Sequence, residues 1–195
     1  MEVFMVSSDI VIVGSSGAGL PILSSIFKRM PLLHGCIILI QHMPAYINEA
    51  VRDNLSKHTE LTVKLAEEND PVKPGFLYIA PSEVHLKLVH NRHIHLLIGE
   101  RVNYVCPSID VAMLSLNSDP YARFMGILLS GIGEDGIKGI RHIKKLGGVT
   151  IALDKKTAPI AGMADGAVAT GDVDFVLSPD QIRKTLIERL GKAGQ

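Results

Sequence analysis

Three side chains in this sequence carry the groups that nucleophilic catalysis needs: Ser16, His42 and Asp135. A serine hydroxyl can attack a carbonyl carbon when a base takes its proton and an acid fixes the tautomer of that base and stabilises its cation. Each of the three residues comes shortly after an apolar run typical of a buried strand. They can act together if the fold brings the ends of these runs to one place.

Each of these residues also has a simpler interpretation. A serine in a strand-to-helix turn commonly caps the helix, and both Ser15 and Ser16 are placed for that role. His42 could be a loop histidine bonded to the backbone, and Asp135 could cap the helix predicted immediately after it. Asp154 also comes directly after a predicted strand, so by its position it is an equally good candidate for the acid. The presence of all three groups favours a triad, because three residues with unrelated structural roles would not be expected to include a hydroxyl, an imidazole and a carboxylate together.

Apolar, largely β-branched runs that predict strands alternate with segments whose apolar residues have helical spacing. The predicted strands are residues 10–13, 36–40, 61–65, 76–80, 124–129, 149–153 and 175–177. The predicted helices are residues 20–30, 47–55, 107–119, 136–146 and 178–190, and residues 158–167 are predicted to hold a loop and a short helix. Two further strand-like runs, residues 84–89 and 93–98, are close enough in the sequence to form a hairpin beside the main sheet.

This alternation predicts an α/β protein: a three-layer α/β/α sandwich with a mainly parallel, doubly wound sheet plus a β-hairpin. No repeat or linker divides the chain, so we expect residues 1–195 to form a single domain with its core at about residues 9–190. Ligands bind outside the carboxyl ends of the strands in such sheets. That edge is where Ser16, His42 and Asp135 are expected to meet.

The turn Gly14-Ser15-Ser16-Gly17-Ala18-Gly19 joins the first strand to the first helix. Glycines permit a crowded turn, and a helix start offers unpaired N–H groups that stabilise a phosphate or an oxyanion. The glycine spacing differs from the dinucleotide-binding fingerprint, and no Gly-Lys-Ser/Thr comes after it for a nucleotide P-loop. Ala18 replaces the last glycine of a nucleophile elbow. The residues alone leave open whether the turn carries a nucleophile or binds an anion.

The composition excludes several function classes. Hydrophobic residues make up 47% of the chain, which excludes disorder, and 20 basic residues balance 20 acidic ones, so no nucleic-acid partner is expected. We expect a cytoplasmic protein without membrane insertion, because no apolar run is long enough to span a bilayer and the N-terminus lacks a basic signal region. Cys36 is expected in the core. His90, His93 and His95 are expected on the hairpin surface, and no metal or cofactor is expected.

Five motifs succeed one another along the chain: Gly14-Ser15-Ser16-Gly17-Ala18-Gly19, Gln41-His42-Met43-Pro44, Pro74-Gly75 through Tyr78-Ile79-Ala80-Pro81 to His85, Pro107-Ser108-Ile109-Asp110-Val111, and Leu129-Ser130-Gly131-Ile132-Gly133-Glu134-Asp135-Gly136. In order and spacing they resemble the catalytic domain of the chemotaxis-receptor protein-glutamate methylesterases, the CheB family. The resemblance extends from about residue 9 to residue 190. Five linked motifs are a far more specific signal than any one of them.

The resemblance implies a serine hydrolase that cleaves γ-glutamyl methyl esters, and in many members deamidates glutamines, on the cytoplasmic helices of methyl-accepting chemotaxis receptors. It places the nucleophile on Ser16, the base on His42 and the acid on Asp135 rather than Asp154. It gives His85 a place at the rim of the cleft, and it implies no metal or cofactor. The alternative is a non-catalytic module of the same fold that docks a receptor or an anionic ligand at the glycine-rich turn.

Several residues depart from the usual pattern of the family, among them Val105 and Cys106 where basic or imidazole residues are usual and Ala164 where proline is usual. Gly17 stands where a hydroxyl residue usually comes after the nucleophile, Ile132 where methionine is usual, and Glu134 where asparagine is usual. A carboxylate at Glu134 is expected to raise the pKa of one member of the pair that it forms with Asp135. The phosphoacceptor domain that most members carry has no counterpart before Asp9. We therefore expect activity without phosphorylation, with any control coming from a separate regulatory protein or from the amount of protein made.

Overall fold

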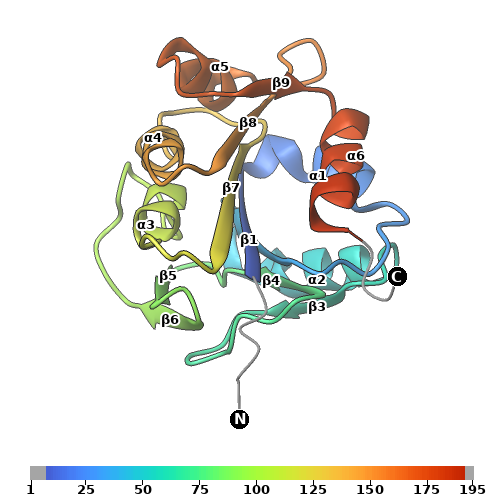
Figure 1. Ribbon diagram of the computed structural model, residues 1–195, viewed down its shortest axis with the longest axis vertical. Coiled ribbons are helices and arrows are strands. Elements are labelled where there is room, and N and C mark those ends of the chain that lie inside the picture. The colour runs from blue at the N-terminus through green and yellow to red at the C-terminus, as the bar shows by residue number, and fades with distance from the viewer. Residues whose placement is uncertain (1–7, 192–195) are drawn as a thin grey trace.

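A computed structural model describes residues 8–191 of the chain, and Figure 1 shows the arrangement of its elements. The strands are β1 (Ser8–Ser15), β2 (Cys36–Gln41), β3 (Thr62–Leu65), β4 (Phe76–Ile79), β5 (His85–Val89), β6 (His93–Leu97), β7 (Ala122–Leu128), β8 (Val149–Leu153) and β9 (Phe175–Leu177). The α-helices are α1 (Leu20–Phe27), α2 (Asn48–Ser56), α3 (Ile109–Leu114), α4 (Ile137–Lys145), α5 (Gly162–Ala169) and α6 (Pro179–Leu190). Two short 3₁₀ turns are η1 (Gly17–Gly19) and η2 (Ala45–Ile47).

Seven strands form one sheet in the order β3-β4-β2-β1-β7-β8-β9, and each neighbouring pair is parallel. The chain winds outward from β1 in one direction through β2, then returns to β7 and winds in the other direction. All six residues of β2 are buried, because a strand covered on both faces needs a continuous apolar run. The predicted α/β fold with a parallel, doubly wound sheet is confirmed.

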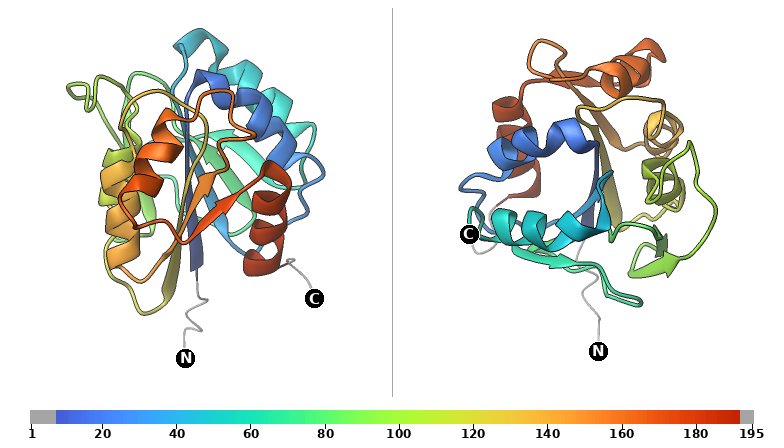
Figure 2. Two further views of the ribbon diagram at one scale, coloured as in Figure 1. Left: turned by 90° about the horizontal axis from the view of Figure 1, so that it is seen from above. Right: turned by 180° about the vertical axis from the view of Figure 1, so that it is seen from behind.

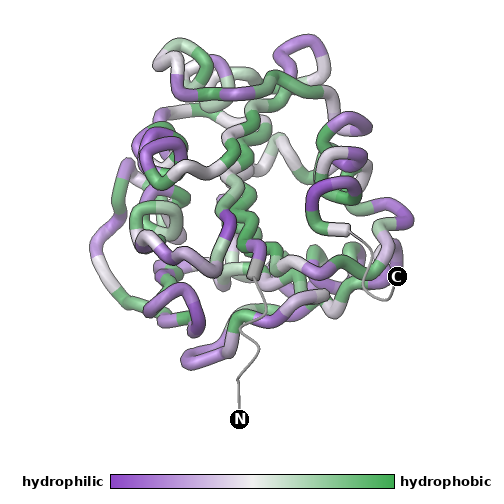
Figure 3. The backbone as a smooth tube through the Cα atoms, viewed as in Figure 1, coloured by the Kyte–Doolittle hydropathy of each residue, from purple (hydrophilic) through white to green (hydrophobic). Residues whose placement is uncertain are grey.

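Helices cover both faces of this sheet, as Figures 1 and 2 show. α1, α2 and α6 pack on one face through residues such as Phe27, Leu55 and Leu186. α3 and α4 pack on the other face through Met113 and Ile140. Figure 3 shows hydrophobic residues along the central strands and hydrophilic ones toward the outside of the helices. These are the three layers that the sequence predicts.

The strands β5 and β6 form a separate antiparallel sheet, so the predicted hairpin is confirmed. Its tight turn places His90 and Asn91 in the left-handed region, with φ values of 50° and 55°. His95 on β6 contacts Glu68 through its Nδ1 atom, at 2.8 Å from Oε1. Within residues 8–191 no group of three or more His, Cys, Asp and Glu side chains has the arrangement of a metal site.

Two helices are shorter than predicted, each for a local reason. α1 ends at Phe27 because Lys28 is extended and Arg29 left-handed, and because Pro31 disfavours a helical residue before it. α3 ends at Leu114, well before residue 119.

The end of α3 is set by Ser115. Its hydroxyl donates to the Ala112 carbonyl at 2.6 Å and accepts the Leu88 N–H of the hairpin at 2.8 Å.

Cys36 is buried at the start of β2, as predicted, and burial raises the pKa of its thiol. None of the helices found between residues 8 and 191 is both long and apolar enough to cross a membrane.

Candidate active site

The carboxyl ends of three adjacent strands position the predicted triad. β1 lies between β2 and β7 in the sheet, and the backbone pairing continues past the strand ends. The N–H of Ser16 donates to the carbonyl of Ser130 at 3.0 Å, and the N–H of His42 donates to the carbonyl of Ser15 at 2.9 Å. The fold therefore brings Ser16, His42 and the loop that carries Asp135 to one edge of the sheet.

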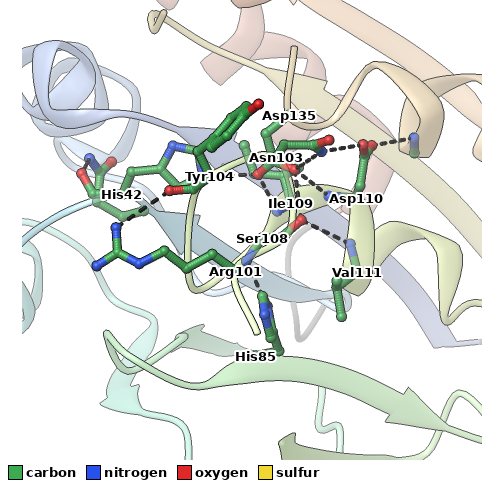
Figure 4. A network of polar contacts seen from close by, with 12 residues as sticks. His42, His85, Arg101, Asn103, Tyr104, Ser108, Ile109, Asp110, Val111 and Asp135 are labelled. Carbon is green, nitrogen blue, oxygen red and sulfur yellow. Dashed lines mark hydrogen bonds and ion pairs between the residues drawn. The ribbon is translucent and has the colours of Figure 1, made fainter. Parts of the chain in front are cut away.

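The His42 ring and the Asp135 carboxylate form a hydrogen bond, with 2.9 Å between Nε2 and Oδ2 (Figure 4). A carboxylate only accepts, so Nε2 carries the proton in this pair and Nδ1 is the nitrogen that can take up another. Both side chains are largely buried, so solvent weakens their interaction little. One ring nitrogen is fixed while the other can act as a base.

Asp135 is 2% exposed and accepts four further hydrogen bonds. The donors are Ser108 Oγ at 2.7 Å, Asn103 Nδ2 at 2.9 Å, the Ile109 N–H at 2.6 Å and the Asp110 N–H at 3.2 Å. Burial by itself raises the pKa of Asp135, but the hydrogen bonds from His42, Ser108, Asn103 and Ile109 outweigh it and lower the pKa below its ordinary value. Asp135 is thus held as a carboxylate.

Asp135 does cap a helix, but not the one that comes next in the sequence. α4 begins after Gly136, which has a φ of 95° and no side-chain cap. The N–H groups that Asp135 accepts belong instead to Ile109 and Asp110, in the first turn of α3. Unpaired N–H groups and the helix dipole stabilise a carboxylate at such a position. The capping role and the contact with His42 therefore coexist in one residue.

The rival acid Asp154 closes the turn after β8. Its Oδ1 accepts the Lys156 N–H at 2.9 Å, and its carbonyl accepts the N–H groups of Thr157 and Ala158. Among the residues that the structure describes, no hydrogen bond joins Asp154 to His42. The carboxylate partner of the imidazole is Asp135.

Ser16 opens the turn η1 with an extended backbone, and its hydroxyl forms no hydrogen bond to any described residue, so it is not a side-chain cap. Ser15 is fully buried, and its hydroxyl donates to the Ser16 carbonyl at 3.4 Å. Gly131 lies against the nucleophile candidate, since a Cβ added there would be 2.8 Å from the Ser16 Cβ. Of the two serines, the half-buried Ser16 is the accessible one.

The expectation that His85 lies at the rim is wrong. His85 is 2% exposed, and its Nδ1 accepts the Ser108 N–H at 3.1 Å. Its Nε2 lies 2.9 Å from the Glu100 carbonyl, so Nε2 carries the proton. The side chain turns inward because both ring nitrogens find backbone partners there, and it fixes Ser108, which in turn donates to Asp135.

The carboxylate that neighbours Asp135 is Asp110, not Glu134. Glu134 is exposed, whereas Asp110 is 2% exposed and accepts the Gly139 N–H at 2.8 Å. Burial raises the pKa of Asp110, and the charge of Asp135 adds to the effect. The pair of Asp110 and Asp135 could not be predicted from the sequence. Glu134 is adjacent to Asp135 in the chain, but neighbouring side chains in a loop can point in different directions. The signal available was the aspartate inside the Pro107–Val111 motif.

A segment not predicted from the sequence crosses this edge of the sheet: residues 99–106, which we call the strap. Asn103, within it, donates to both Asp110 and Asp135. A cavity of about 210 Å³ lies between the strap and His42. Its lining includes Ser82, Glu83, Arg101, Tyr104 and Cys106. The only sequence signal for the strap is an asparagine in a two-residue turn between valines.

The chain is similar to known proteins of one family. The model of the CheB methylesterase family matches residues 11–186. A protein-glutamate methylesterase/protein-glutamine glutaminase of Thermotoga maritima is 35% identical over 187 residues, which are 94% of this chain and 54% of that protein. A putative enzyme of the same name from Leptospira interrogans is 32% identical over 180 residues, 92% of this chain and 93% of that protein.

A solved structure resembles the whole described fold. The crystal structure of the Thermotoga maritima CheB methylesterase catalytic domain superposes with a TM-score of 0.86 at 34% identity, covering 94% of this chain and all of that one. The fold and site define an α/β domain with a serine, an imidazole and a buried carboxylate at one edge of the parallel sheet. The chain belongs to the CheB methylesterase family. It spans about half the length of several curated relatives that it matches.

Proposed function

We propose that this chain is the catalytic domain of a protein-glutamate methylesterase, a serine hydrolase that cleaves γ-glutamyl methyl esters and deamidates glutamines. The observation that carries the proposal is the hydrogen bond between His42 Nε2 and Asp135 Oδ2, beside Ser16, within the segment that the family model matches. The names of the Thermotoga and Leptospira relatives support the substrate class.

In this proposal Ser16 Oγ attacks the ester carbonyl carbon while Nδ1 of His42 takes the hydroxyl proton. The Nε2 proton stays on His42, and its hydrogen bond to Asp135 stabilises the imidazolium. Collapse of the tetrahedral intermediate breaks the bond to the methoxy oxygen, which takes the Nδ1 proton and leaves as methanol. Water then attacks the acyl group on Ser16, His42 again takes and returns a proton, and a glutamate side chain is released. With a glutamine substrate the first leaving group is ammonia.

The contact between Ser16 and His42 forms only with substrate in this scheme. Within the described residues the Ser16 hydroxyl is not hydrogen-bonded to the imidazole. Catalytic hydrogen bonds are often long in ligand-free sites and shorten in the complex, so rotation of the Ser16 side chain completes the triad.

The oxyanion is proposed to bind at the start of η1. No described residue accepts a hydrogen bond from the backbone N–H of Gly17 or Ala18, which leaves both donors available. Donors of this kind each lower the barrier by ~2.7–4 kcal/mol. A Cβ at Gly17 would meet only the His42 carbonyl, at 3.9 Å, so the approach to this turn is open.

The proposed partner is the cytoplasmic helix of a methyl-accepting chemotaxis receptor, which places the domain in the cytoplasm. Three exposed apolar side chains support a protein substrate: Tyr46, Tyr104 and Ile132. They belong to the segments that come after β2, β6 and β7, which also supply His42, the strap and Asp135. Apolar side chains in such numbers around a site are typical of a protein-binding surface.

The test is release of methanol from a methylated receptor fragment by the wild type, Ser16→Ala and Ser15→Ala. We expect Ser16→Ala to lose about 10⁴-fold or more in kcat, as for other triad nucleophiles, and Ser15→Ala to keep most activity. Equal losses, or a loss in Ser15→Ala alone, would overturn the assignment of the nucleophile. A folded wild type that binds the fragment without turnover would favour the non-catalytic docking module.

A further inference from the structure

The strap makes a two-residue turn at the edge of the candidate active site. Val102 and Val105 each donate a backbone hydrogen bond to the other at 3.1 Å. Between them, Asn103 and Tyr104 have left-handed φ values of 52° and 66°. Tyr104 is 92% exposed, whereas the Asn103 amide reaches inward. The turn therefore presents one polar side chain to the interior.

The Asn103 amide lies between two buried carboxylates. Its Nδ2 is 2.8 Å from Asp110 Oδ2 and 2.9 Å from Asp135 Oδ1 (Figure 4). An amide nitrogen has two protons and no charge, so it can donate one proton to each carboxylate and cannot itself titrate. Among the described residues, no other side chain bridges the two.

Carboxylates that share a buried site do not both remain ionised without such donors. The like charge makes it easier for the coupled pair to take up one proton, so that the pair binds it at a higher pH. A protonated Asp135 would offer His42 a weaker acceptor and would no longer stabilise the imidazolium. A neutral donor placed between the two carboxylates prevents this without adding a charge that competes with His42.

Few other charged groups face this pair of carboxylates. His42 comes directly after β2, and His85 of β5 reaches Asp135 only through Ser108. α4 contributes the backbone N–H of Gly139. The charged side chains of α4 are exposed: Lys138, Arg141, Lys144 and Lys145. On the strap itself, Arg101 is exposed and donates to the Tyr104 carbonyl at 3.4 Å.

We propose that Asn103 is a positioning residue for the proposed hydrolysis: its amide keeps Asp135 an unprotonated acceptor for His42 beside the second carboxylate, Asp110. The inference rests on the proposed function, since it assigns Asn103 a role toward the same acid and base. On this proposal, the strap both lines the cavity and holds the acid of the proposed triad in its ionised form.

The test replaces Asn103 in two ways. Asn103→Gly removes the amide but tolerates the left-handed turn, and Asn103→Asp keeps the shape while replacing the donor by a third carboxyl group. We expect Asn103→Gly to lower kcat by about 10- to 100-fold, the range of a lost charge-assisted hydrogen bond, with KM changed little. The acidic limb of its pH–rate profile should move to higher pH, because the carboxylate pair takes up a proton. Asn103→Asp should lose at least as much activity.

Asn91 provides a matched control. It too is a left-handed asparagine in a hairpin turn, with a side chain bonded to another segment, Asn117, at 2.7 and 3.0 Å. Asn91→Gly should lower the unfolding temperature as much as Asn103→Gly does while leaving kcat and the pH profile unchanged. Equal kinetic losses in both variants would mean that Asn103 acts only through stability, which would overturn the proposal.

A rescue variant separates charge from structure. In Asn103→Gly/Asp110→Asn the second carboxylate is gone, and the new amide oxygen can still accept the Gly139 N–H. We expect the acidic limb to return toward its wild-type position. A profile as displaced as that of Asn103→Gly would contradict the proposal.

A readout without substrate keeps this inference distinct from the proposed function. The Nε2 proton of His42, bonded to Asp135, should give a downfield ¹H NMR signal that Asn103→Gly loses at a higher pH than the wild type. An unchanged signal in a folded variant would refute the positioning role. If the wild type shows this behaviour but releases no methanol, the proposed function fails while the inference about Asn103 stands.

Discussion

Two buried carboxylates lie at opposite ends of the same sheet and have very different partners. Asp9, at the start of β1, is 7% exposed and accepts both Nε and Nη2 of Arg123 on β7, each at 2.6 Å. Asp135, beyond the end of β7, accepts an imidazole, a hydroxyl, an amide and two backbone N–H groups. The first partner is permanently charged, and every partner of the second is neutral or titratable.

In the proposed mechanism, this difference places the chemistry at the Asp135 end of the sheet. The guanidinium of Arg123 cannot give up a proton, so its pair with Asp9 can tie β1 to β7 but cannot transfer a proton. The imidazole of His42 can change charge, and its fixed Nε2 leaves Nδ1 as a base. A cavity of about 350 Å³ at the Asp9 end has no serine, cysteine or histidine among its lining residues, whereas the cavity of about 210 Å³ beside the strap is lined by His42.

The largest effect should come from replacing the carboxylate of Asp135 by an amide. Asp135→Asn should lower kcat by about 10⁴-fold, as a wrong imidazole tautomer does in the serine-protease template. Asp9→Asn and Asp154→Asn should leave kcat nearly unchanged, because neither side chain contacts His42. Steady-state methanol release by the three purified variants checks this ranking. A greater loss in Asp154→Asn than in Asp135→Asn would reverse the roles of the two acids.

Two glycines near Ser16, Gly131 and Gly17, differ in how closely they are packed. A Cβ at Gly131 would lie 2.8 Å from the Ser16 Cβ and 2.3 Å from the Met163 sulfur, whereas a Cβ at Gly17 meets little. Gly131→Ala should displace the nucleophile and lower kcat by about 10²-fold, the usual effect of a misplacement near 1 Å. Gly17→Ala should retain activity within a few-fold. Similar losses in both would show that the turn does not hold Ser16 against Gly131.

The smallest effect on activity should come from the Asp9 end. Arg123→Ala leaves a mostly buried carboxylate without its donors and should lower the free energy of unfolding by about 1–3 kcal/mol. Its kcat should match that of the wild type at a temperature where both are folded. Urea unfolding and methanol release on the same preparation make the comparison. A large loss of kcat without loss of stability would show that the two ends of the sheet are coupled, contrary to the separation of roles.

Long-range order in this fold could be predicted from the sequence because it depends on simple patterns. Continuous apolar runs such as Cys36–Gln41 predict strands buried on both faces, and alternation with helices predicts a parallel sheet. Parallel strands bring the residues just beyond their carboxyl ends to one edge, and this is why the sequence alone could group Ser16, His42 and Asp135.

The partners of Asp135 could not be predicted in the same way. Asn103 and Ser108 lie 32 and 27 residues away along the chain, on segments whose placement depends on the packing of α3. A two-residue turn such as the one at Asn103 leaves no periodic signal. The sequence around His85 does not distinguish a surface histidine from a buried one. In the structure, both of its ring nitrogens have backbone partners, Ser108 and Glu100.

The most direct test of the central claim is to find which residue reacts covalently with a serine-directed reagent. Incubation with a fluorophosphonate, followed by peptide mass spectrometry, should place one phosphonyl group on Ser16 of the wild type. His42→Ala should react far more slowly because the hydroxyl loses its base. A label on Ser15, or a wild type as unreactive as His42→Ala, would contradict the assignment of Ser16, His42 and Asp135 as a catalytic triad.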